Sequence, residues 1–287
     1  MFNFAVVVFV AELTGRLPRI QNTTLKTDLE VIFDLNIDKY DFDTQPVRII
    51  GEANSLKYDT RVEELAPTVP RNTTIHMRGY HQSWKYSRSA ECRLRQIFII
   101  HERIHDLIDR FFVTSIPPKW TRNFIRVGIH VRRGDIELAE KLQFGYTIPN
   151  RTYFFNAMQY FTLNYGPRVQ FFVVSNDMTW CKKEFPSIET ELNQYNDSSN
   201  VTQGKTASDA DIRVNVTYSV AHSFGVDFAL LSSCDHVIMS TGTYGWWAAW
   251  LAKGTTIYYA DWPRKGSSLW REFTKEDFFP PSWIGMT

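Results

Sequence analysis

The chain has 287 residues, of which 44% are hydrophobic and 22% charged, and a formal net charge of +1 at pH 7. This composition supports one large hydrophobic core or two smaller ones and excludes an intrinsically disordered chain. Because the basic residues are scattered along the chain, the sequence also lacks the electrostatic footprint of a protein that binds nucleic acid or an anionic membrane surface.

The first residues predict a buried helix. Apolar positions recur through residues 2–14, and Gly15 follows where helices commonly end in a left-handed residue. The longest apolar run near the start, residues 5–11, is too short for a membrane-spanning helix, which needs about twenty residues. It also lacks the basic region and cleavage site of a signal peptide. If the protein enters the secretory pathway, we expect its targeting segment upstream of Met1.

Residues 89–112 predict a long amphipathic helix, because their apolar residues recur at intervals of three and four. His101 and His105 lie within this pattern. Partly buried positions on a helix explain these histidines better than a metal site does.

The tandem prolines Pro117 and Pro118 remove two backbone donors and force an extended path. We place the domain boundary here. The prediction is an amino-terminal, acceptor-side lobe of residues 1–116, incomplete at its start, followed by a nucleotide-sugar lobe of residues 117–287.

Beyond the prolines, short strands rich in Val, Ile and Phe alternate with helices. The predicted strands are residues 125–131, 169–174, 236–239 and 256–259, and the predicted helices are residues 152–165, 221–232 and 244–251. Such alternation indicates an α/β fold with a doubly wound parallel sheet.

In such sheets ligands bind beyond the carboxyl ends of the strands. The first strand of the second lobe ends in His130, Arg132, Arg133 and Asp135. Arginine suits phosphate because its planar fork donates paired hydrogen bonds and keeps its charge. An arginine that only pairs with Asp135 is an equally good interpretation of this segment by itself.

Two further strand ends carry polar side chains. Ser175 and Asn176 follow the second strand, and taken alone they are typical of a turn. Ser240, Thr241 and Thr243 lead into a helix, where hydroxyls and free amides favour an anion, although Ser and Thr also cap helices in any protein. Together the three ends indicate a diphosphate and hence a nucleotide. Neither the dinucleotide glycine fingerprint nor a Walker lysine motif is present.

Several stretches resemble the alpha-1,2-fucosyltransferase family, which is glycosyltransferase family 11, and they occur in the family's order. They are residues 79–86, 127–135, 172–181, 227–231, 241–249 and 281–285. The His-x-Arg-Arg-Gly-Asp motif is specific, since related alpha-1,6- and protein O-fucosyltransferases share it but few other proteins do. The resemblance is strong after residue 75 and weak before it.

This resemblance implies a GT-B-like, two-lobed α/β glycosyltransferase with a Rossmann-like nucleotide-sugar domain. It implies an inverting, metal-independent enzyme that transfers L-fucose from GDP-fucose to the 2-hydroxyl of a terminal galactose on a glycan. Members of the family are type II Golgi membrane proteins, so a lumenal location and a membrane anchor outside this chain are also implied.

The resemblance further implies roles for single residues. Arg132 and Arg133 are implied to hold the donor diphosphate, so we expect lysine at Arg133 to abolish transfer. Asp227 is implied to lie near the nucleoside. The other candidate donor-binding residues are His130, Ser175, Asn176, Ser240, Thr241 and Thr243. Asp135 is a candidate general base, or it only orients the arginines.

The opening of the chain departs from the family. Members carry a Gly-x-Gly-Asn-Gln segment before the first helix, and residues 1–5 resemble its continuation without the glycines. We therefore expect this chain to bind GDP weakly and to transfer little fucose. A fragmentary gene model is the preferred interpretation, and an inactive paralogue is the second.

Glycosylation sequons favour a secretory-pathway protein. They lie at Asn22, Asn72, Asn150, Asn196, Asn200 and Asn215, the last three in a stretch that we expect to be a polar loop. The cysteines Cys92, Cys181 and Cys234 allow at most one intrachain disulfide and leave the redox compartment undecided.

Alternative functions stay open. The donor motifs do not read the acceptor, so another fucose linkage is compatible with them, as is an inactive sugar-binding paralogue. Residues 133–135 spell the adhesion tripeptide Arg-Gly-Asp, but a strand end inside a core domain is a poor place for an exposed ligand. Asp209 and Asp211 resemble an Asp-x-Asp metal motif. Because they lie away from any predicted strand end, a solvated pair of charges is favoured over a metal site. We expect no cofactor and no metal.

Overall fold

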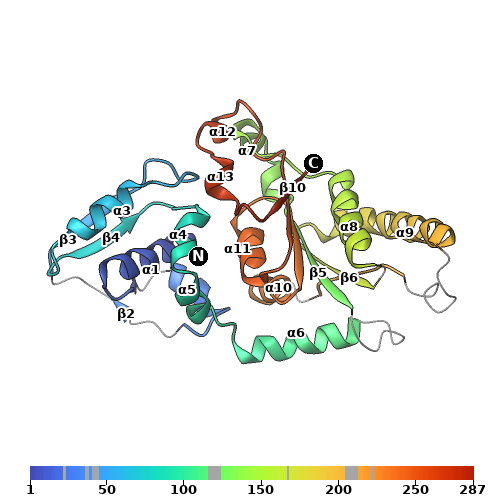
Figure 1. Ribbon diagram of the computed structural model, residues 1–287, viewed down its shortest axis with the longest axis horizontal. Coiled ribbons are helices and arrows are strands. Elements are labelled where there is room, and N and C mark those ends of the chain that lie inside the picture. Colours follow the sequence, from blue (N-terminus) through green and yellow to red (C-terminus); the bar gives the residue numbers. More distant parts are fainter. Residues whose placement is uncertain are drawn as a thin grey trace. The chain divides into compact units, whose positions relative to one another are not determined.

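The computed structural model describes residues 1–21, 24–35, 39–40, 45–115, 124–166, 168–203, 213–220 and 223–287. The chain divides into two compact units (Figure 1). Unit 1 comprises Met1–Glu102 and Ser268–Pro281, and unit 2 comprises Arg103–Ser267 and Ser282–Thr287.

Unit 1 is built around α1, which is buried on most of its surface, as the sequence predicts. Gly15 ends this helix with a φ of 62°, which confirms the expected left-handed cap. Around it lie α2 (Thr24–Glu30), α3 (Arg61–Leu65), the 3₁₀ turn Ala66–Thr68, α4 (Trp84–Ser89), α5 (Glu91–Ile97), α12 (Ser268–Arg271) and α13 (Lys275–Phe278), with α1 itself spanning Phe2–Thr14. Two short parallel pairs complete it: β1 (Ile20–Gln21) with β2 (Lys39–Tyr40), and β3 (Val47–Gly51) with β4 (Thr74–Arg78).

The described part of unit 2 forms a six-stranded, fully parallel sheet in the order β10-β9-β8-β5-β6-β7. The strands are β5 (Ile125–Val131), β6 (Val169–Ser175), β7 (Asn215–Tyr218), β8 (His236–Met239), β9 (Thr256–Tyr259) and β10 (Ile284–Met286). The helices are α6 (Glu102–Ser115), α7 (Ala139–Phe144), α8 (Arg151–Tyr165), α9 (Met178–Gln203), α10 (Phe224–Ser232) and α11 (Thr243–Ala252), with a 3₁₀ turn at Gly134–Glu137.

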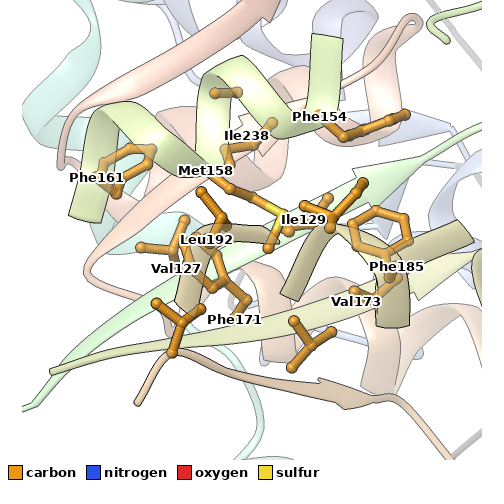
Figure 2. Packing of buried hydrophobic residues seen from close by; sticks show 14 of the residues in the cluster. Val127, Ile129, Phe154, Met158, Phe161, Phe171, Val173, Phe185, Leu192 and Ile238 are labelled. Atoms are coloured by element: carbon orange, nitrogen blue, oxygen red, sulfur yellow. The ribbon is translucent and has the colours of Figure 1, made fainter. Parts of the chain in front are cut away.

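Side chains of β5 alternate between two covered faces, as the pleat of a strand requires. Val127 and Ile129 belong to the main hydrophobic core, to which α8 and α9 contribute Phe161 and Phe185 (Figure 2). On the other face, a Cβ at Gly128 would lie 3.0 Å from Leu231 of α10. Helices therefore cover both faces, which confirms the predicted doubly wound α/β sheet.

The predicted single helix over residues 89–112 is wrong. The structure instead has α5 and α6 with a break between them, because residues 98–101 form backbone bonds to another segment. Asp34 N donates to Ile99 O at 2.8 Å, and His101 N donates to Ile32 O at 3.0 Å. Tertiary pairing of the backbone thus interrupts a helical apolar pattern.

The two units also differ from the predicted division at residue 116. Helix α6 belongs to unit 2, where the ring of Phe112 meets that of Phe172 in β6 at 4.9 Å. Residues 268–281 return to unit 1, where Lys85 Nζ pairs with Asp277 Oδ1 at 2.6 Å. Contacts between segments distant in the sequence place α6 in unit 2 and residues 268–281 in unit 1, and a single boundary along the chain cannot represent them.

The expected polar loop over residues 196–217 is wrong at both of its ends. Helix α9 continues to Gln203 and β7 begins at Asn215, while residues 204–212 lie outside the described residues. Strand β7 is short, lies at the edge of the described sheet and buries Val216, and the alternation of Val214, Val216 and Tyr218 is typical of a half-buried strand that the sequence analysis did not single out.

Cys92, Cys181 and Cys234 are all free thiols, and Cys181 and Cys234 are buried. Within the described ranges, no helix combines the length and apolar character needed to cross a membrane.

Replacing Phe161 with alanine should lower the free energy of unfolding by about 3–5 kcal/mol, because this fully buried ring fills the core beneath α8. Leu163→Ala on the same helix is the control. Its side chain is 60% exposed, so we expect a change within about 0.5 kcal/mol. Urea unfolding of both variants provides the measurement, and equal effects would contradict the assigned core.

Candidate functional site

The strand order of unit 2 reverses between β5 and β8. In chain order the sheet reads 3-2-1-4-5-6, with β5 as the first strand and β8 as the fourth. In sheets of this topology, ligands bind at the carboxyl ends of the two strands that flank the reversal. The loops that follow these strands diverge there and leave a crevice. In this chain those ends carry Arg132 and Ser240.

Buried hydrogen bonds join the two strand ends. Ser240 Oγ lies 3.2 Å from His130 Nδ1 and accepts a bond from Arg132 N at 2.9 Å. Both Ser240 and His130 are almost completely buried. Burial and the nearby Arg132 guanidinium lower the pKa of His130 to about 3, so its ring is neutral at physiological pH. Through its contacts with His130 Nδ1 and Arg132 N, the Ser240 hydroxyl holds the end of β8 against the end of β5.

The Arg132 side chain is oriented from two sides. Its Nε donates to Asp135 Oδ1 at 3.1 Å, and its guanidinium lies against Gly242, the residue that precedes α11. Gly242 has a φ of 95°, and a Cβ there would collide with Arg132 Nη1. The positive φ favours glycine here, and a Cβ would displace the guanidinium of Arg132 from this position. The arginine charge and the amino end of α11 converge, which favours an anion at this point.

Asp135 forms the salt bridge that the sequence left open as one interpretation. The hydrogen bond from Arg132 is the largest cause that holds the pKa of Asp135 below its usual value. A carboxylate with a lowered pKa is a weak base. Its geometry fits the orientation of Arg132 better than proton abstraction.

The Arg133 side chain is held elsewhere. Its guanidinium lies 4.3 Å from the ring of Trp180 and pairs with Glu137 Oε1 at 2.7 Å. Its Nε is 3.9 Å from Asp177 Oδ2. Arg133 is not among the residues that line the cavity described below. Arg132 therefore reaches the site, whereas Arg133 braces the loops after β5 and β6.

Asn176 fastens these two loops together. Its Oδ1 accepts from Arg133 N at 2.8 Å, and its Nδ2 donates to Arg133 O at 3.2 Å. Ser175 Oγ accepts from Asp177 N, and Asp177 Oδ1 accepts from Trp180 N at 3.0 Å, which caps the start of α9. The turn chemistry expected for this segment is present, and Ser175 and Asn176 also line the cavity.

A cavity of about 390 Å³ opens at these strand ends, within the size range of small-molecule sites. Its lining residues all belong to unit 2: His130, Arg132, Val174, Ser175, Asn176, Met178, Ser219, Phe224, Asp227 and Tyr244. It therefore combines apolar and aromatic walls with a guanidinium and a carboxylate.

The carboxylate of the cavity is held in place. Ser219 Oγ donates a short hydrogen bond to Asp227 Oδ1. Tyr244 Oη donates to Phe224 O at 2.6 Å, which fixes the start of α10, the helix that carries Asp227. Burial is the main cause that raises the pKa of Tyr244, so this phenol stays protonated.

The remaining candidates have mixed positions. Thr243 is the first residue of α11 and is half-buried. Thr241 is 1% exposed, and its hydroxyl has no hydrogen-bond partner in the described part of the chain. Neither lines the cavity. Asp209 and Asp211 lie outside the described residues, within which no cluster of metal ligands occurs.

The sequons occupy different surroundings. Asn72 is exposed in a turn. Asn150 Oδ1 caps α8 by accepting from Tyr153 N at 3.0 Å, and Asn215 Nδ2 donates to Gln170 Oε1 at 2.8 Å. Asn196 is half-buried on α9. Asn22 and the side chain of Asn200 lie outside the described part.

Sequence reasoning did not single out Ser219, Phe224 or Met178 as site residues. Ser219 directly follows β7, so the rule of reading strand ends would have found it if β7 had been recognised. Met178 begins α9 and Phe224 begins α10, and hydrophobic residues at helix starts carry no distinguishing signal.

Comparisons with known proteins identify the family of this chain. The sequence model described as "Glycosyl transferase family 11" matches residues 1–287. Galactoside alpha-(1,2)-fucosyltransferase 1 of Rattus norvegicus is 26% identical over 100% of this chain and 69% of its own length. Galactoside alpha-(1,2)-fucosyltransferase 2 of Mus musculus is 29% identical over 100% of the chain and 74% of its length.

Galactoside alpha-(1,2)-fucosyltransferase 1 of Bos taurus is 30% identical over 74% of this chain, but the match spans only 53% of its own length, about half. Among solved structures, a mutant of Arabidopsis thaliana FUT1 in complex with GDP matches with a TM-score of 0.53 at 11% identity. That match covers 90% of this chain and 68% of the other. It confirms the predicted GT-B-like α/β fold.

The buried His130 predicts a specific pH dependence of stability. Its folded pKa of about 3 lies below the usual value of 6.5, so between these pH values the unfolded chain binds the extra proton. The stabilising contribution is fully present above pH 6.5 and is lost as the pH falls, by about 1.4 kcal/mol per pH unit inside the window. Urea unfolding between pH 6.5 and 5 should show a steeper loss for the parent than for His130→Gln. Equal slopes would contradict a buried neutral histidine.

Proposed function

The chain belongs to glycosyl transferase family 11, and we propose that unit 2 binds GDP-fucose and that the protein transfers L-fucose to the 2-hydroxyl of a terminal galactose on a glycan. The observation that carries this proposal is the cavity in which Arg132 and the amino end of α11 form one pole and Asp227 lines the wall. The names of the relatives, galactoside alpha-(1,2)-fucosyltransferases, support the acceptor and the linkage.

Arg132 and the start of α11 suit the diphosphate of GDP, and Asp227 suits its guanine base. A carboxylate such as Asp227 accepts hydrogen bonds from the N–H groups on the edge of guanine, which adenine does not offer in the same arrangement. The apolar walls suit the flat base, and Phe224 and Tyr244 are aromatic. The diphosphate then meets Arg132 and the free amides of α11.

The same arrangement suits the chemical step. In an inverting transfer the acceptor hydroxyl oxygen forms a bond to C1 of fucose and its O–H bond breaks, the proton passing to solvent, while the bond from C1 to the diphosphate oxygen breaks. GDP leaves with the electron pair, so negative charge grows on the diphosphate. Arg132 is already oriented by Asp135 and Gly242, and therefore stabilises this charge with little reorganisation.

We also propose that this reaction needs no metal ion, because an arginine and a helix terminus supply the positive charge that a divalent cation supplies elsewhere.

The proposed location is the Golgi lumen, supported by the exposed sequon at Asn72. Glycosidase treatment of the secreted protein, followed by mass analysis of the Asn72 peptide, tests this location.

Arg132→Lys should lower kcat for transfer from GDP-fucose by about a hundredfold or more, because an ammonium group cannot form the paired hydrogen bonds that a guanidinium forms with a diphosphate. Arg133→Lys is the matched control. The family resemblance implies that this change abolishes transfer, but the guanidinium of Arg133 lies against Trp180 and Glu137, so from the structure we expect a smaller loss. Initial rates with lactose as acceptor, with the linkage of the product determined by NMR, provide the measurement. A larger loss for Arg133→Lys would make Arg133 the diphosphate ligand instead.

Transfer should continue unchanged in excess EDTA at neutral pH, since the charge on departing GDP is met by protein groups. The measurement is the initial rate before and after dialysis against the chelator. Loss of activity that manganese restores would overturn the metal-free mechanism and direct attention to Asp209 and Asp211.

A further inference from the structure

Ser219 lies directly after β7 and is fixed to the sheet by its backbone. Its N–H donates to Val173 O of β6 at 2.9 Å, which continues the pairing of the two strands one residue beyond Tyr218. Ser219 is only 5% exposed, yet it lines the cavity. Because its backbone is held by the sheet, its hydroxyl has a defined position in the cavity wall.

The hydroxyl of Ser219 contacts the carboxylate of the cavity. Its Oγ donates a short hydrogen bond to Asp227 Oδ1. Asp227 lies in the first turn of α10, where the amino end of a helix favours a negative charge. The hydrogen bond therefore attaches the carboxylate on α10 to the end of a strand of the sheet.

This hydrogen bond restricts how the carboxylate turns. The terminal torsion of an aspartate side chain has broad minima, so the plane of the two oxygens is poorly defined unless a partner holds it. A carboxylate has two oxygens with roughly four acceptor positions, so one bond to Oδ1 leaves acceptor positions on both oxygens. Ser219 thus fixes the plane of the Asp227 carboxylate without using up its capacity to accept.

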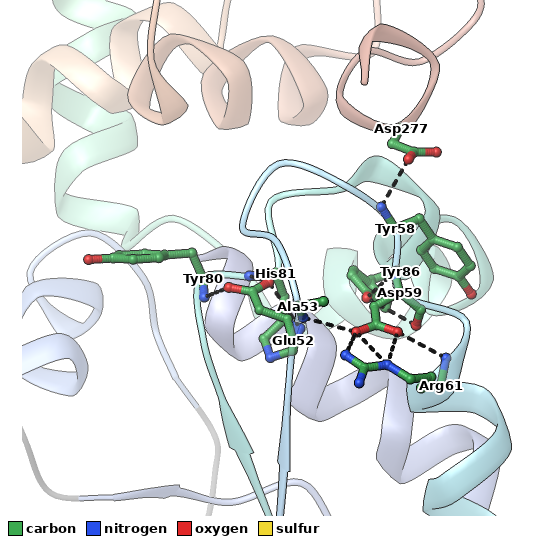
Figure 3. A network of polar contacts seen from close by, with 9 residues as sticks. All are labelled: Glu52, Ala53, Tyr58, Asp59, Arg61, Tyr80, His81, Tyr86 and Asp277. Carbon is green, nitrogen blue, oxygen red and sulfur yellow. Dashed lines mark hydrogen bonds and ion pairs between the residues drawn. The ribbon is translucent and has the colours of Figure 1, made fainter. Parts of the chain in front are cut away.

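A carboxylate that is held in place is not by itself a ligand site. In unit 1, Asp59 Oδ2 accepts from Ala53 N at 3.1 Å and Asp59 Oδ1 accepts from Arg61 Nε at 2.9 Å (Figure 3). Asp59 is not among the residues that line the cavity. Its bonds join parts of unit 1, whereas Asp227 combines a bond from a neutral hydroxyl with a place in the cavity wall.

We propose that Ser219 positions the Asp227 carboxylate so that both of its oxygens accept from guanine at once, one from N1–H and the other from the 2-amino group. The inference rests on the proposed function, in which Asp227 meets the guanine of GDP. Two donors side by side on the base need two acceptors in one plane, and the Ser219 bond fixes that plane. Hypoxanthine has the N1–H but lacks the 2-amino group. A comparison of GDP with inosine diphosphate therefore measures the second of these bonds.

Calorimetric titration of the 287-residue chain with GDP and with inosine diphosphate tests the role of Ser219. We expect the parent to bind GDP about tenfold more tightly, the effect of one hydrogen bond to a charged group. Ser219→Ala should reduce this preference to about threefold or less, because a carboxylate that turns freely keeps one good bond more easily than two. Its affinity for inosine diphosphate should stay within about twofold of the parent. Ser219→Thr keeps the hydroxyl and should keep the parent's preference.

Ser232→Ala is the matched control. Ser232 lies at the other end of α10, outside the cavity lining, and its hydroxyl donates to Ala229 O at 3.2 Å. We expect this variant to keep the preference of the parent. A purely structural role for Ser219 predicts that Ser219→Ala weakens the binding of both nucleotides by the same factor, and that result would overturn the proposal.

A double variant tests whether Ser219 acts through Asp227. In an Asp227→Ala background, adding Ser219→Ala should leave the ratio of the two affinities unchanged, because the carboxylate that Ser219 positions is gone. A further change in that ratio would show that Ser219 contacts the base directly, which contradicts the proposed positioning role.

The titrations need no turnover, so they separate this inference from the proposed reaction. If Ser219→Ala loses the preference for GDP but the parent transfers no fucose, the positioning role stands and the proposed reaction fails. If the parent transfers fucose and Ser219→Ala keeps the full preference, the reaction stands and the positioning role is wrong. Equal affinity of the parent for the two nucleotides would also overturn the positioning role.

Discussion

The site depends on the close approach of Arg132 to Gly242. This contact joins the end of β5 to the start of α11, so one guanidinium and one helix terminus act on the same point. It needs a glycine with positive φ, a serine that accepts from the Arg132 amide, and a carboxylate that orients the guanidinium. Repulsion between two sources of positive potential is relieved when an anion lies between them.

The remaining parts of unit 2 maintain this contact and complete the cavity. The Arg133 stack on Trp180 and the Asn176 bonds fix the loops after β5 and β6 relative to each other. The hydrogen bond from Tyr244 to the start of α10 holds the helix that carries Asp227. A guanidinium and a carboxylate thus occur in one cavity, as the proposed GDP site requires. This combination distinguishes a nucleotide site from a general anion site.

The sequence predicts the parts of the fold that bury continuous apolar runs. The bounds of β5, β8 and β9 are confirmed as predicted, because fully buried parallel strands leave a plain hydrophobic signal. Edge strand β7 is missed although Val214, Val216 and Tyr218 alternate as in a half-buried strand. The break before α6 is missed because it depends on backbone pairing with a distant segment. Local pattern does not contain that information.

The same limit applies to the site. Strand ends point to the correct loops, yet Arg132 and Arg133 are adjacent and chemically identical, and only packing separates them. Trp180, which holds Arg133, lies 47 positions further along the chain. From the sequence alone Ser240 is a candidate phosphate ligand, whereas the structure shows its hydroxyl buried against His130. The tertiary partner of a polar side chain decides its role.

The central claim is that the cavity of unit 2 recognises guanosine diphosphate through both poles. Calorimetric titration of the chain with GDP, GMP and ADP, repeated with Asp227→Ala, tests it most directly. We expect GDP to bind at least about tenfold more tightly than either GMP or ADP, a difference of about 1.4 kcal/mol, and Asp227→Ala to remove the preference over ADP while keeping that over GMP. Equal affinity of the parent for GDP and ADP, or for GDP and GMP, would contradict the claim.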